Sequence, residues 1–311
     1  SFFKVTLIDD KDYFEYTPGI LRGCVEPSHV PHMQSKHTDY LNGVTIINGK
    51  IESIQRNCVI VNGRRIRFDK LCISLGSIYG QNRLGMTACD DAKTLAKYHT
   101  KLKLSKSVLI TGGGPTGVEL AAEICCAHPS LKVTLVHSKD RLLERCDLRA
   151  SRYAKTFLTD HGVNVILDDK ITAKKDKEYI TANGARIKAD IAFSCTGITP
   201  NTQMIEGLPM DKKGHLRVDK TLRVVGHKNI FAPGDINDIA CEKTAQNAKL
   251  QARAVIENIR GGDVEFDARP TPLVISLGKH DGIFTHKGIT FTGRIPSFMK
   301  KAIERKEMIS H

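Results

Sequence analysis

A glycine-rich turn at residues 112–117 constrains this chain more than any other stretch. Gly112, Gly114 and Gly117 have the spacing G-x-G-x-x-G, between an apolar run at 107–111 and a helix-like run at 118–124. In that order the first glycine permits a tight turn, the second lets the backbone approach a pyrophosphate, and the third lets helix and strand pack closely. The helix amides would then face the phosphates. The pattern predicts a dinucleotide-binding unit, the alternative being a turn whose glycines serve packing alone.

The chain carries the flanking pattern twice. Lys4-Val-Thr-Leu-Ile-Asp9 nearly repeats Lys132-Val-Thr-Leu-Val-His137, the strand that follows the glycine-rich turn and its helix. Asn-Gly pairs at 62–63 and 183–184 lie between alternating apolar runs, which is typical of a two-residue hairpin. Equal distances separate these pairs from Gly76 and Gly197, each closing a buried run. We interpret this as a duplicated nucleotide-binding unit.

The first copy lacks its glycine-rich turn in this sequence. In the second copy the turn precedes the Lys-Val-Thr-Leu strand, whereas in the first copy that strand starts at Lys4. We therefore expect an N-terminally truncated chain, without the first strand, the first glycine-rich turn and most of the first helix.

Composition narrows the class of protein. The chain has 311 residues, enough for two domains, and no apolar run that could span a membrane. Its nine cysteines have no C-x-x-C spacing, which predicts a reducing, cytoplasmic location without a zinc site or redox dithiol. The net charge of +13 would suit nucleic acid, an anionic membrane surface or anionic cofactors, or it is a solvated basic surface.

The residues that end the two repeated strands differ. An acid at this position normally accepts a hydrogen bond from the adenosine ribose, and Asp9 is in place to do so. His137 occupies the position in the second copy, where it would not repel a 2′-phosphate, so that site is expected to take NADPH as well as NADH. The alternative is a surface histidine without influence on this choice.

Further motifs follow the second copy. Residues 221–235 form a hairpin and strand that close in Gly234-Asp235, where the carboxylate either faces a ligand or caps the next helix. A helix is expected at 244–259, stopped by Gly261-Gly262. Short strand-like runs then lead into a basic amphipathic helix from Pro296, which would lie on an anionic membrane or dock on its own domain. Its apolar face would combine Phe298, Met299, Ala302, Ile303 and Ile309.

Together these motifs resemble the FAD/NAD(P)-dependent pyridine nucleotide-disulfide oxidoreductases. The likeness is greatest to the ferroptosis-suppressor type of apoptosis-inducing-factor homologues, through Leu277-Gly-Lys-His-Asp-Gly282, and then to type II NADH dehydrogenases. The resemblance implies an α/β fold with two Rossmann-like domains, the NAD(P) domain inserted in the FAD domain, plus a small C-terminal α+β domain. The corresponding limits are 1–100 and 206–267 for FAD, 101–205 for NAD(P)H, and 268–311 for the C-terminal domain.

The resemblance also implies an activity: hydride passes from NAD(P)H to FAD and on to a quinone. FAD-site residues would be Asp9, Thr17, Pro18, Gly76, Gly234, Asp235 and Ala245; NAD(P)H-site residues would be Gly112, Gly114, Gly117, His137 and Gly197; catalytic candidates are Glu119, Gln246 and Lys301. Glu119 and Lys301 have the alternative of being ordinary solvated residues. Because the first glycine-rich turn is missing, this chain is expected to bind FAD poorly.

Two other interpretations stay open. In the first, the chain is a non-catalytic homologue that has lost flavin and binds a nucleotide or, less favoured, a nucleic acid. In the second, it is the same flavoprotein with another electron acceptor. Those acceptors are monodehydroascorbate, a ferredoxin-like protein or oxygen. Disulfide reduction is disfavoured, since Cys125 and Cys126 are adjacent on a helix and face different ways. A quinone reductase in the cytoplasm is the preferred hypothesis. For its C-terminal basic helix, docking on its own domain is slightly favoured over peripheral contact with a membrane.

Overall fold

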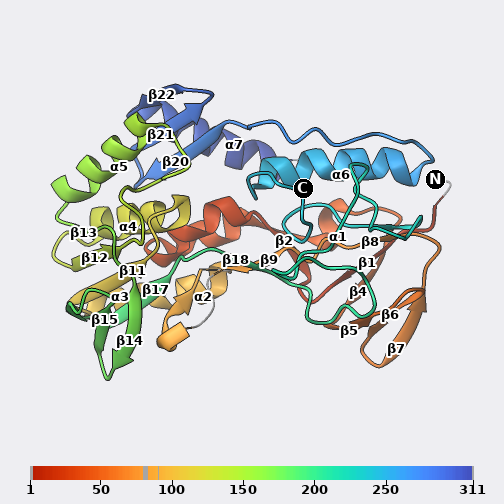
Figure 1. The fold of residues 1–311 in the computed structure, drawn as a ribbon, viewed down its shortest axis with the longest axis horizontal. Coiled ribbons are helices and arrows are strands. Elements are labelled where there is room, and N and C mark those ends of the chain that lie inside the picture. The colour runs from red at the N-terminus through yellow and green to blue at the C-terminus, as the bar shows by residue number, and fades with distance from the viewer. Residues whose placement is uncertain (1–2, 80–82, 90, 310–311) are drawn as a thin grey trace.

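The structure is a computed structural model that describes residues 3–79, 83–89 and 91–309. The ribbon shows two α/β lobes connected by a narrow waist, with a third layer of strands and helix along one side (Figure 1). Among the described residues, no helix is both long and apolar enough to cross a lipid bilayer.

The second copy of the repeat forms a five-stranded parallel sheet. Its order is β10 (Thr87–Ala88), β17 (Ile191–Ser194), β11 (Ser107–Thr111), β12 (Lys132–Val136) and β13 (Asn164–Ile166). β11 is central because its residues are apolar and buried on both faces, as expected of a parallel strand covered by helices. β10 joins this sheet although it precedes residue 101, where we expected the NAD(P)H domain to begin.

Helices and a hairpin sheet cover this unit. The connections between its strands contain η3 (Arg83–Gly85), α2 (Ala92–Ala96), α3 (Tyr98–Leu104), α4 (Pro115–Ala127), α5 (Leu148–Asp160), and the antiparallel strands β14 (Ile171–Lys175), β15 (Glu178–Thr181) and β16 (Arg186–Lys188). The turn at Asn183-Gly184 lies between β15 and β16, and Gly184 has the positive φ (85°) that such a turn needs.

In the first copy, the strands that correspond to the neighbours of β11 belong to two separate two-stranded pairs. β1 (Thr6–Asp9) pairs in parallel with β4 (Thr45–Asn48), and β8 (Leu71–Cys72) pairs in parallel with β19 (Ile230–Phe231). By the repeat, β1 corresponds to β12 and β8 to β17, which flank β11 in the second copy. Within the described residues, the first copy has no counterpart of β11 between them. In keeping with this, Val5 is 48% exposed, whereas its counterpart Val133 is 2% exposed.

The remaining elements of this lobe lie around those pairs. They are β2 (Tyr13–Glu15), η1 (Thr17–Cys24), η2 (Pro27–Met33), β3 (Gln34–Lys36), α1 (His37–Tyr40), β5 (Ile51–Ile54), β6 (Cys58–Val61), β7 (Arg64–Arg67) and α6 (Ala245–Ile259). Val61 pairs with Arg64 across Asn62-Gly63, which confirms the two-residue hairpin. The β8–β19 pair joins residues on both sides of the second copy, so the second unit is inserted into the first.

Two chain crossings connect the lobes. β9 (Ser77–Tyr79) and β18 (Ile198–Pro200) run antiparallel, so the outgoing and returning crossings form one ribbon. Gly76 and Gly197, which we expected to close the two units, directly precede these strands. Both have positive φ (63° and 95°), which a side chain would disfavour at the point where the chain turns into the ribbon.

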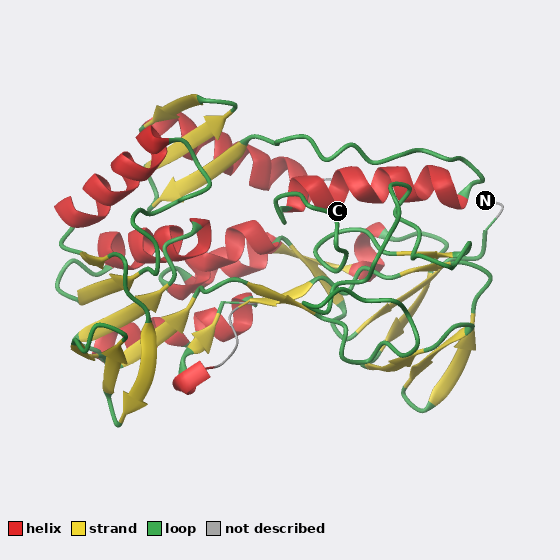
Figure 2. Cartoon of the chain, viewed as in Figure 1, coloured by secondary structure: helices red, strands yellow, loops and turns green. Residues whose placement is uncertain are grey.

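The C-terminal segment forms the third layer. The antiparallel strands β20 (Leu273–Leu277), β21 (Asp281–His286) and β22 (Ile289–Thr292) precede α7 (Arg294–Ile309) (Figure 2). α7 packs on β20 and β21, and β20 packs on α4. The expected small α+β unit is therefore present.

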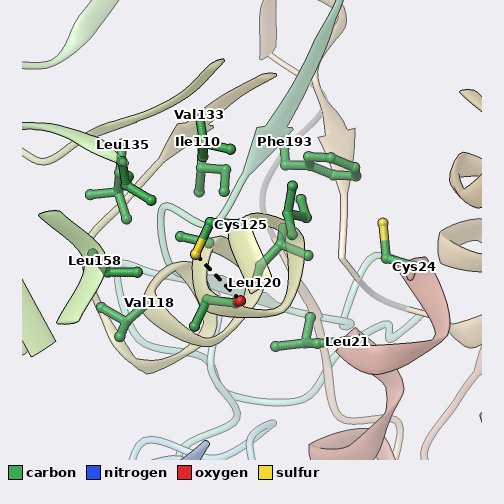
Figure 3. Packing of buried hydrophobic residues seen from close by; sticks show 14 of the residues in the cluster. Leu21, Cys24, Ile110, Val118, Leu120, Cys125, Val133, Leu135, Leu158 and Phe193 are labelled. Atoms are coloured by element: carbon green, nitrogen blue, oxygen red, sulfur yellow. Dashed lines mark hydrogen bonds between the residues drawn. The ribbon is translucent and has the colours of Figure 1, made fainter. Parts of the chain in front are cut away.

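One apolar core joins the three layers. Leu120 of α4 faces the side with Phe193 of the sheet and Leu21 of η1, whereas Val118 lies on the other side of the helix, next to Leu158 of α5 (Figure 3). Ile275 of β20 belongs to the same cluster. Fully burying such a side chain contributes about 1.5–3 kcal/mol, so α4, the helix after the glycine-rich turn, is held from three sides.

A dinucleotide turn beside a buried charge network

The glycine-rich turn leaves no room for a side chain at three of its four glycines: Gly113 is crowded by the side chains of Leu142 and His137, and Gly112 and Gly117 by backbone. A Cβ at Gly117 would lie 1.9 Å from the carbonyl oxygen of Gly112, and a Cβ at Gly112 would lie 2.3 Å from that of Cys195. At Gly114, the N-cap of α4, a Cβ would meet nothing within 4 Å. The first and third glycines therefore serve packing, and the second leaves open space in front of the amides of α4. This is a cradle that fits a pyrophosphate.

His137 is buried beneath the turn. Its Nδ1 accepts a hydrogen bond from the Gly113 amide at 3.0 Å, and its Nε2 lies 3.3 Å from a carboxylate oxygen of Glu144. His137 is 7% exposed, so the interpretation as a surface histidine is wrong. Because Nδ1 accepts, the proton is on Nε2 and faces Glu144. Sequence reasoning missed Glu144. Its carboxylate lies beside His137 at the end of β12, where the sequence of the second copy has no acid.

A cleft of about 770 Å³ opens in front of the turn. Gly114 and Pro115 form one wall, Glu144 belongs to a second segment, and Asn247 of α6 and His286 of β21 lie across it. The cleft is thus lined by both lobes and by the C-terminal layer. Its volume is within the range of ordinary ligand pockets.

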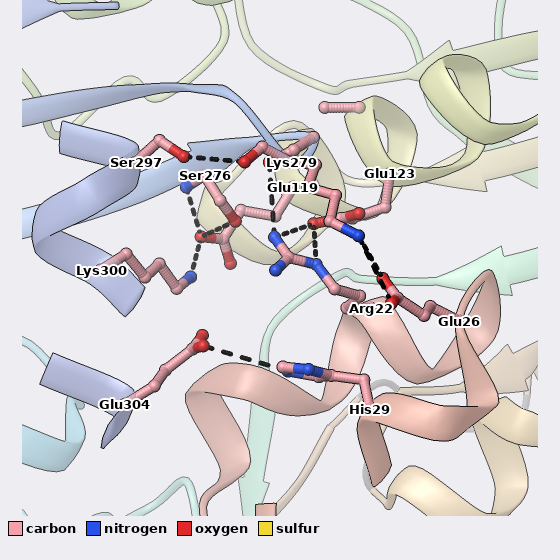
Figure 4. A network of polar contacts seen from close by, with 12 residues as sticks. Arg22, Glu26, His29, Glu119, Glu123, Ser276, Lys279, Ser297, Lys300 and Glu304 are labelled. Carbon is pink, nitrogen blue, oxygen red and sulfur yellow. Dashed lines mark hydrogen bonds and ion pairs between the residues drawn. The ribbon is translucent and has the colours of Figure 1, made fainter. Parts of the chain in front are cut away.

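Two acids on α4 link the three layers (Figure 4). Glu119 accepts hydrogen bonds from the Ser276 amide (2.8 Å) and hydroxyl (3.2 Å) and forms an ion pair with Lys300 of α7. One turn later, Glu123 pairs with Arg22 of η1, which donates from Nε (3.2 Å) and Nη2 (3.0 Å). Both acids are at least nine-tenths buried, so Glu119 is not an ordinary exposed helix residue.

Further titratable groups lie beside these pairs. Burial, followed by the charges of Glu304 and its neighbours, raises the pKa of the Tyr16 phenol. Burial also raises the pKa of the Glu304 carboxyl and lowers the pKa of His29 to about 4, and these two groups lie 3.9 Å apart. Each pKa shift favours the neutral form of the group, because burial removes the water that would stabilise its charged form. Perturbed groups cluster at functional sites, which marks this junction as a candidate site.

Lys300, and not the catalytic candidate Lys301, is the lysine of α7 that pairs with Glu119. The two lysines are consecutive on α7, so they point about 100° apart, and the structure places Lys300 against Glu119. Lys301 remains an untested catalytic candidate. Helical periodicity placed Phe298, Ile303 and Ile309 on one face of α7, and this face is exposed. The opposite face, with Ser297 and Glu304, docks on the protein, and that choice depends on the tertiary fold.

The predicted FAD-site residues of the first lobe come from three separate segments. Asp9 ends β1 and lies 3.4 Å from Nε2 of His37, while Thr17 and Pro18 open η1. Asp235 follows β19 and accepts a hydrogen bond from Ser77 at 2.9 Å. Asp235 is not the N-cap of the next helix, since Thr244 has that role for α6.

Two other predicted residues stand at the start of α6. Ala245 and Gln246 are its first residues and both are exposed. Gly234 has a positive φ (89°), and its amide donates to Gln251 of the same helix at 2.7 Å. Gly234 and Asp235 are half-buried, whereas Ala245 and Gln246 face solvent.

Comparisons with known proteins agree with this arrangement. The model of the pyridine nucleotide-disulphide oxidoreductase family matches residues 3–253. Ferroptosis suppressor protein 1 of Taeniopygia guttata is 27% identical, over 93% of this chain and 83% of that protein. Apoptosis-inducing factor homolog B of Dictyostelium discoideum is also 27% identical, over 99% of this chain and 89% of that protein.

A solved structure shows the same fold. The sulfide:quinone oxidoreductase of Aquifex aeolicus superposes with a TM-score of 0.83 at 18% identity, over 97% of this chain and 84% of that chain. The predicted fold class is therefore confirmed. The chain belongs to the pyridine nucleotide-disulphide oxidoreductase family, and it is an oxidoreductase built on two dinucleotide-binding units.

Proposed function

We propose that this protein is an FAD-dependent oxidoreductase that passes hydride from NAD(P)H to flavin and electrons on to a quinone-type acceptor. The observation that carries the proposal is the cradle at Gly112–Gly117, which opens onto a cleft lined by both nucleotide-binding units. The names of relatives support the acceptor, since one relative of known structure is a sulfide:quinone oxidoreductase.

The residues present fit two dinucleotides. The amides of α4 and Gly114 would hold the NAD(P)H pyrophosphate, with Gly197 at the open end of the same unit. Asp9, Gly76 and Asp235 would hold FAD, with Thr17, Pro18 and Ala245 beside it. When bound, the two cofactors supply hydride transfer and one- or two-electron chemistry. In this proposal, residues 1–100 and 206–267 bind FAD and residues 101–205 bind NAD(P)H, together with β10, which joins the NAD(P)H-side sheet.

Charged and polar side chains where α4, η1 and α7 meet would stabilise charge that develops during electron transfer. Glu119 pairs with Lys300, so this position offers an oppositely charged pair in a site largely shielded from water. Pre-organised charges of this kind stabilise charge that develops during a reaction, because they need no reorganisation. The raised pKa values of Tyr16 and Glu304 favour their protonated forms, which donate hydrogen bonds. Gln246 would contact the acceptor from the start of α6.

Flavin binding and turnover test the proposal. We would purify this chain, and the same chain extended upstream of Ser1 by a strand, a glycine-rich turn and a helix, and record flavin absorbance. NAD(P)H oxidation with a short-chain quinone, monodehydroascorbate, a ferredoxin-like protein or oxygen as acceptor follows. We expect the extended chain to be yellow and to reduce the quinone fastest. Absence of both flavin and NAD(P)H oxidation would contradict the proposal, and salt-dependent DNA binding by a colourless protein would favour the nucleic-acid alternative.

We also propose peripheral contact with an anionic membrane through α7. This helix is inverted relative to an ordinary surface helix: Ser297 and Glu304 face the protein at 4% and 7% exposure, while Phe298 and Ile309 are 74% and 76% exposed. Ile295 (66%) is one turn from Phe298. Exposed apolar side chains next to lysine and arginine are typical of helices that lie in a lipid interface. α7 can therefore dock on its own domain through one face and contact a membrane through the other.

A further inference from the structure

Two cysteines that are distant in sequence meet next to the dinucleotide turn. The sulfur atoms of Cys89 and Cys195 are 3.8 Å apart, although 106 positions separate the residues. The reason is strand register: Ala88 of β10 pairs with Ser194 of β17 in parallel, so the next residue of each strand is the neighbour of the other. No spacing rule for cysteines reveals such a pair.

This placement suits a disulfide. Neighbouring strands lie about 4.8 Å apart, which is within the roughly 4.4–6.8 Å between Cα atoms that a disulfide requires. The sulfurs are already near van der Waals contact, so side-chain rotation and a small backbone shift would bring them to bonding distance. Cys89 is 2% exposed, and Cys195 is partly exposed at the open end of the sheet. A small oxidant therefore reaches Cys195 first.

Cys195 is in direct contact with the turn. Its amide donates to the carbonyl of Thr111 at 2.7 Å, and its carbonyl is the atom that excludes a side chain at Gly112. A Cβ at Gly117 would lie 3.4 Å from the Cβ of Cys195. No free space separates the floor of the turn from this cysteine, so a backbone shift at Cys195 moves the turn.

The same two residues follow neighbouring strands of one sheet. Cys89 directly follows β10, whereas Cys195 directly follows β17 and precedes Gly197 and β18, the returning crossing. A covalent bond between them would therefore fix the ends of these two strands beside the glycine-rich turn, at the point where the returning crossing leaves the sheet.

We propose that Cys89 and Cys195 are a modification site at which a hydroperoxide forms a reversible disulfide that weakens NAD(P)H binding. Hydrogen peroxide oxidises the Cys195 thiol to a sulfenic acid and releases one water. The Cys89 thiol then attacks that sulfur, forms the S–S bond and releases a second water, so two thiols lose two hydrogens and two electrons to the peroxide. The effect on binding rests on the proposed NAD(P)H site.

The test combines peptide mapping with NADH titration. The reduced protein is treated with hydrogen peroxide, and non-reducing digestion with mass spectrometry identifies the linked peptides. NADH affinity is measured before oxidation, after it, and after dithiothreitol. We expect a Cys89–Cys195 link and an NADH affinity about tenfold weaker, within the usual span of coupling between sites, with recovery on reduction. Cys89→Ser and Cys195→Ser would abolish the response, whereas Cys126→Ser, which removes an exposed thiol on α4, would keep it.

Two outcomes would overturn the inference. One is oxidised wild-type protein without the linked peptide, and the other is the linked peptide with unchanged NADH affinity. Both can be read in the wild-type protein even if a serine variant folds poorly. Failure of the proposed function looks different, because the reduced protein would then not bind NADH at all, while the mass measurement would still report the disulfide.

Discussion

Glu119 and Lys300, which are 181 positions apart in the chain, form a buried ion pair between α4 and α7. Through this pair the helix after the glycine-rich turn is attached to the last helix of the chain. Ser276 adds two hydrogen bonds to the same carboxylate oxygen. The C-terminal layer is therefore a structural part of the junction between the two nucleotide-binding units.

Lys300→Met would leave the Glu119 carboxylate buried without its cation. Removal of one partner of a buried pair typically costs about 3–5 kcal/mol, and we expect a loss of about 3 kcal/mol in the free energy of unfolding. Lys301→Met is the matched control, expected within about 0.5 kcal/mol of wild type. The double variant Glu119→Gln/Lys300→Met should recover most of the loss. Urea unfolding measures all three, and equal effects of the two lysine variants would contradict the pair's role.

Gly117→Ala and Gly114→Ala should separate folding from nucleotide binding. The alanine methyl at Gly117 would collide with the carbonyl of Gly112 at 1.9 Å, so we expect a stability loss of about 3 kcal/mol or more. At Gly114 the φ of −74° and the open space accommodate alanine. There we expect unchanged stability but NADH affinity at least about tenfold weaker, because the methyl occupies the approach of the pyrophosphate. Unchanged NADH affinity in Gly114→Ala would count against the cradle.

Glu144→Gln tests whether this acid disfavours a 2′-phosphate. Glu144 lies beside His137 at the strand end, where its negative charge would repel the phosphate of NADPH. Removing the charge should raise the preference for NADPH over NADH by about fivefold. Asp140→Asn, in the exposed loop after the same strand, is the control and should leave the ratio unchanged. The ratio of the two dissociation constants is the measured quantity.

His29 should make the protein less stable in acid. Burial, followed by the charge of Arg22, lowers its pKa to about 4, against about 6.5 in the unfolded chain. As the pH falls from 6.5 towards 4, the unfolded chain binds a proton that the folded protein does not, so stability is present above this window and lost within it. Glu304 acts in the opposite direction, since its raised pKa favours the folded state at low pH.

His29→Asn isolates the histidine contribution. Between pH 7 and pH 5 we expect the variant to lose about 1 kcal/mol less than wild type, after allowance for partial solvation. His280→Asn, at an exposed position, should behave as wild type. Urea unfolding at the two pH values gives the comparison. An equal acid loss in wild type and His29→Asn would show that another group titrates.

The exposed apolar face of α7 should determine membrane binding. Ile295→Ser/Phe298→Ser is expected to weaken binding to vesicles that contain anionic lipid by about tenfold or more, since two apolar side chains no longer leave water. Leu104→Ser, at an 82% exposed leucine on α3, is the control and should bind as wild type. Added salt should weaken wild-type binding, because the lysine and arginine contribution is screened. Vesicle co-sedimentation is the measurement.

The sequence determined the nucleotide turn, the duplicated unit, the hairpin at Asn62-Gly63 and the limits of α6, because these depend on glycine conformation and on local periodicity. It also placed Asp9 at the end of a strand and Asp235 in the loop that follows one. Tertiary structure alone decided that Lys300 rather than Lys301 meets Glu119, that Glu144 approaches His137, and that α7 turns its apolar face outward. It alone placed Cys89 beside Cys195. These contacts come from strand register and helix docking between distant segments, and no local pattern of residues encodes them.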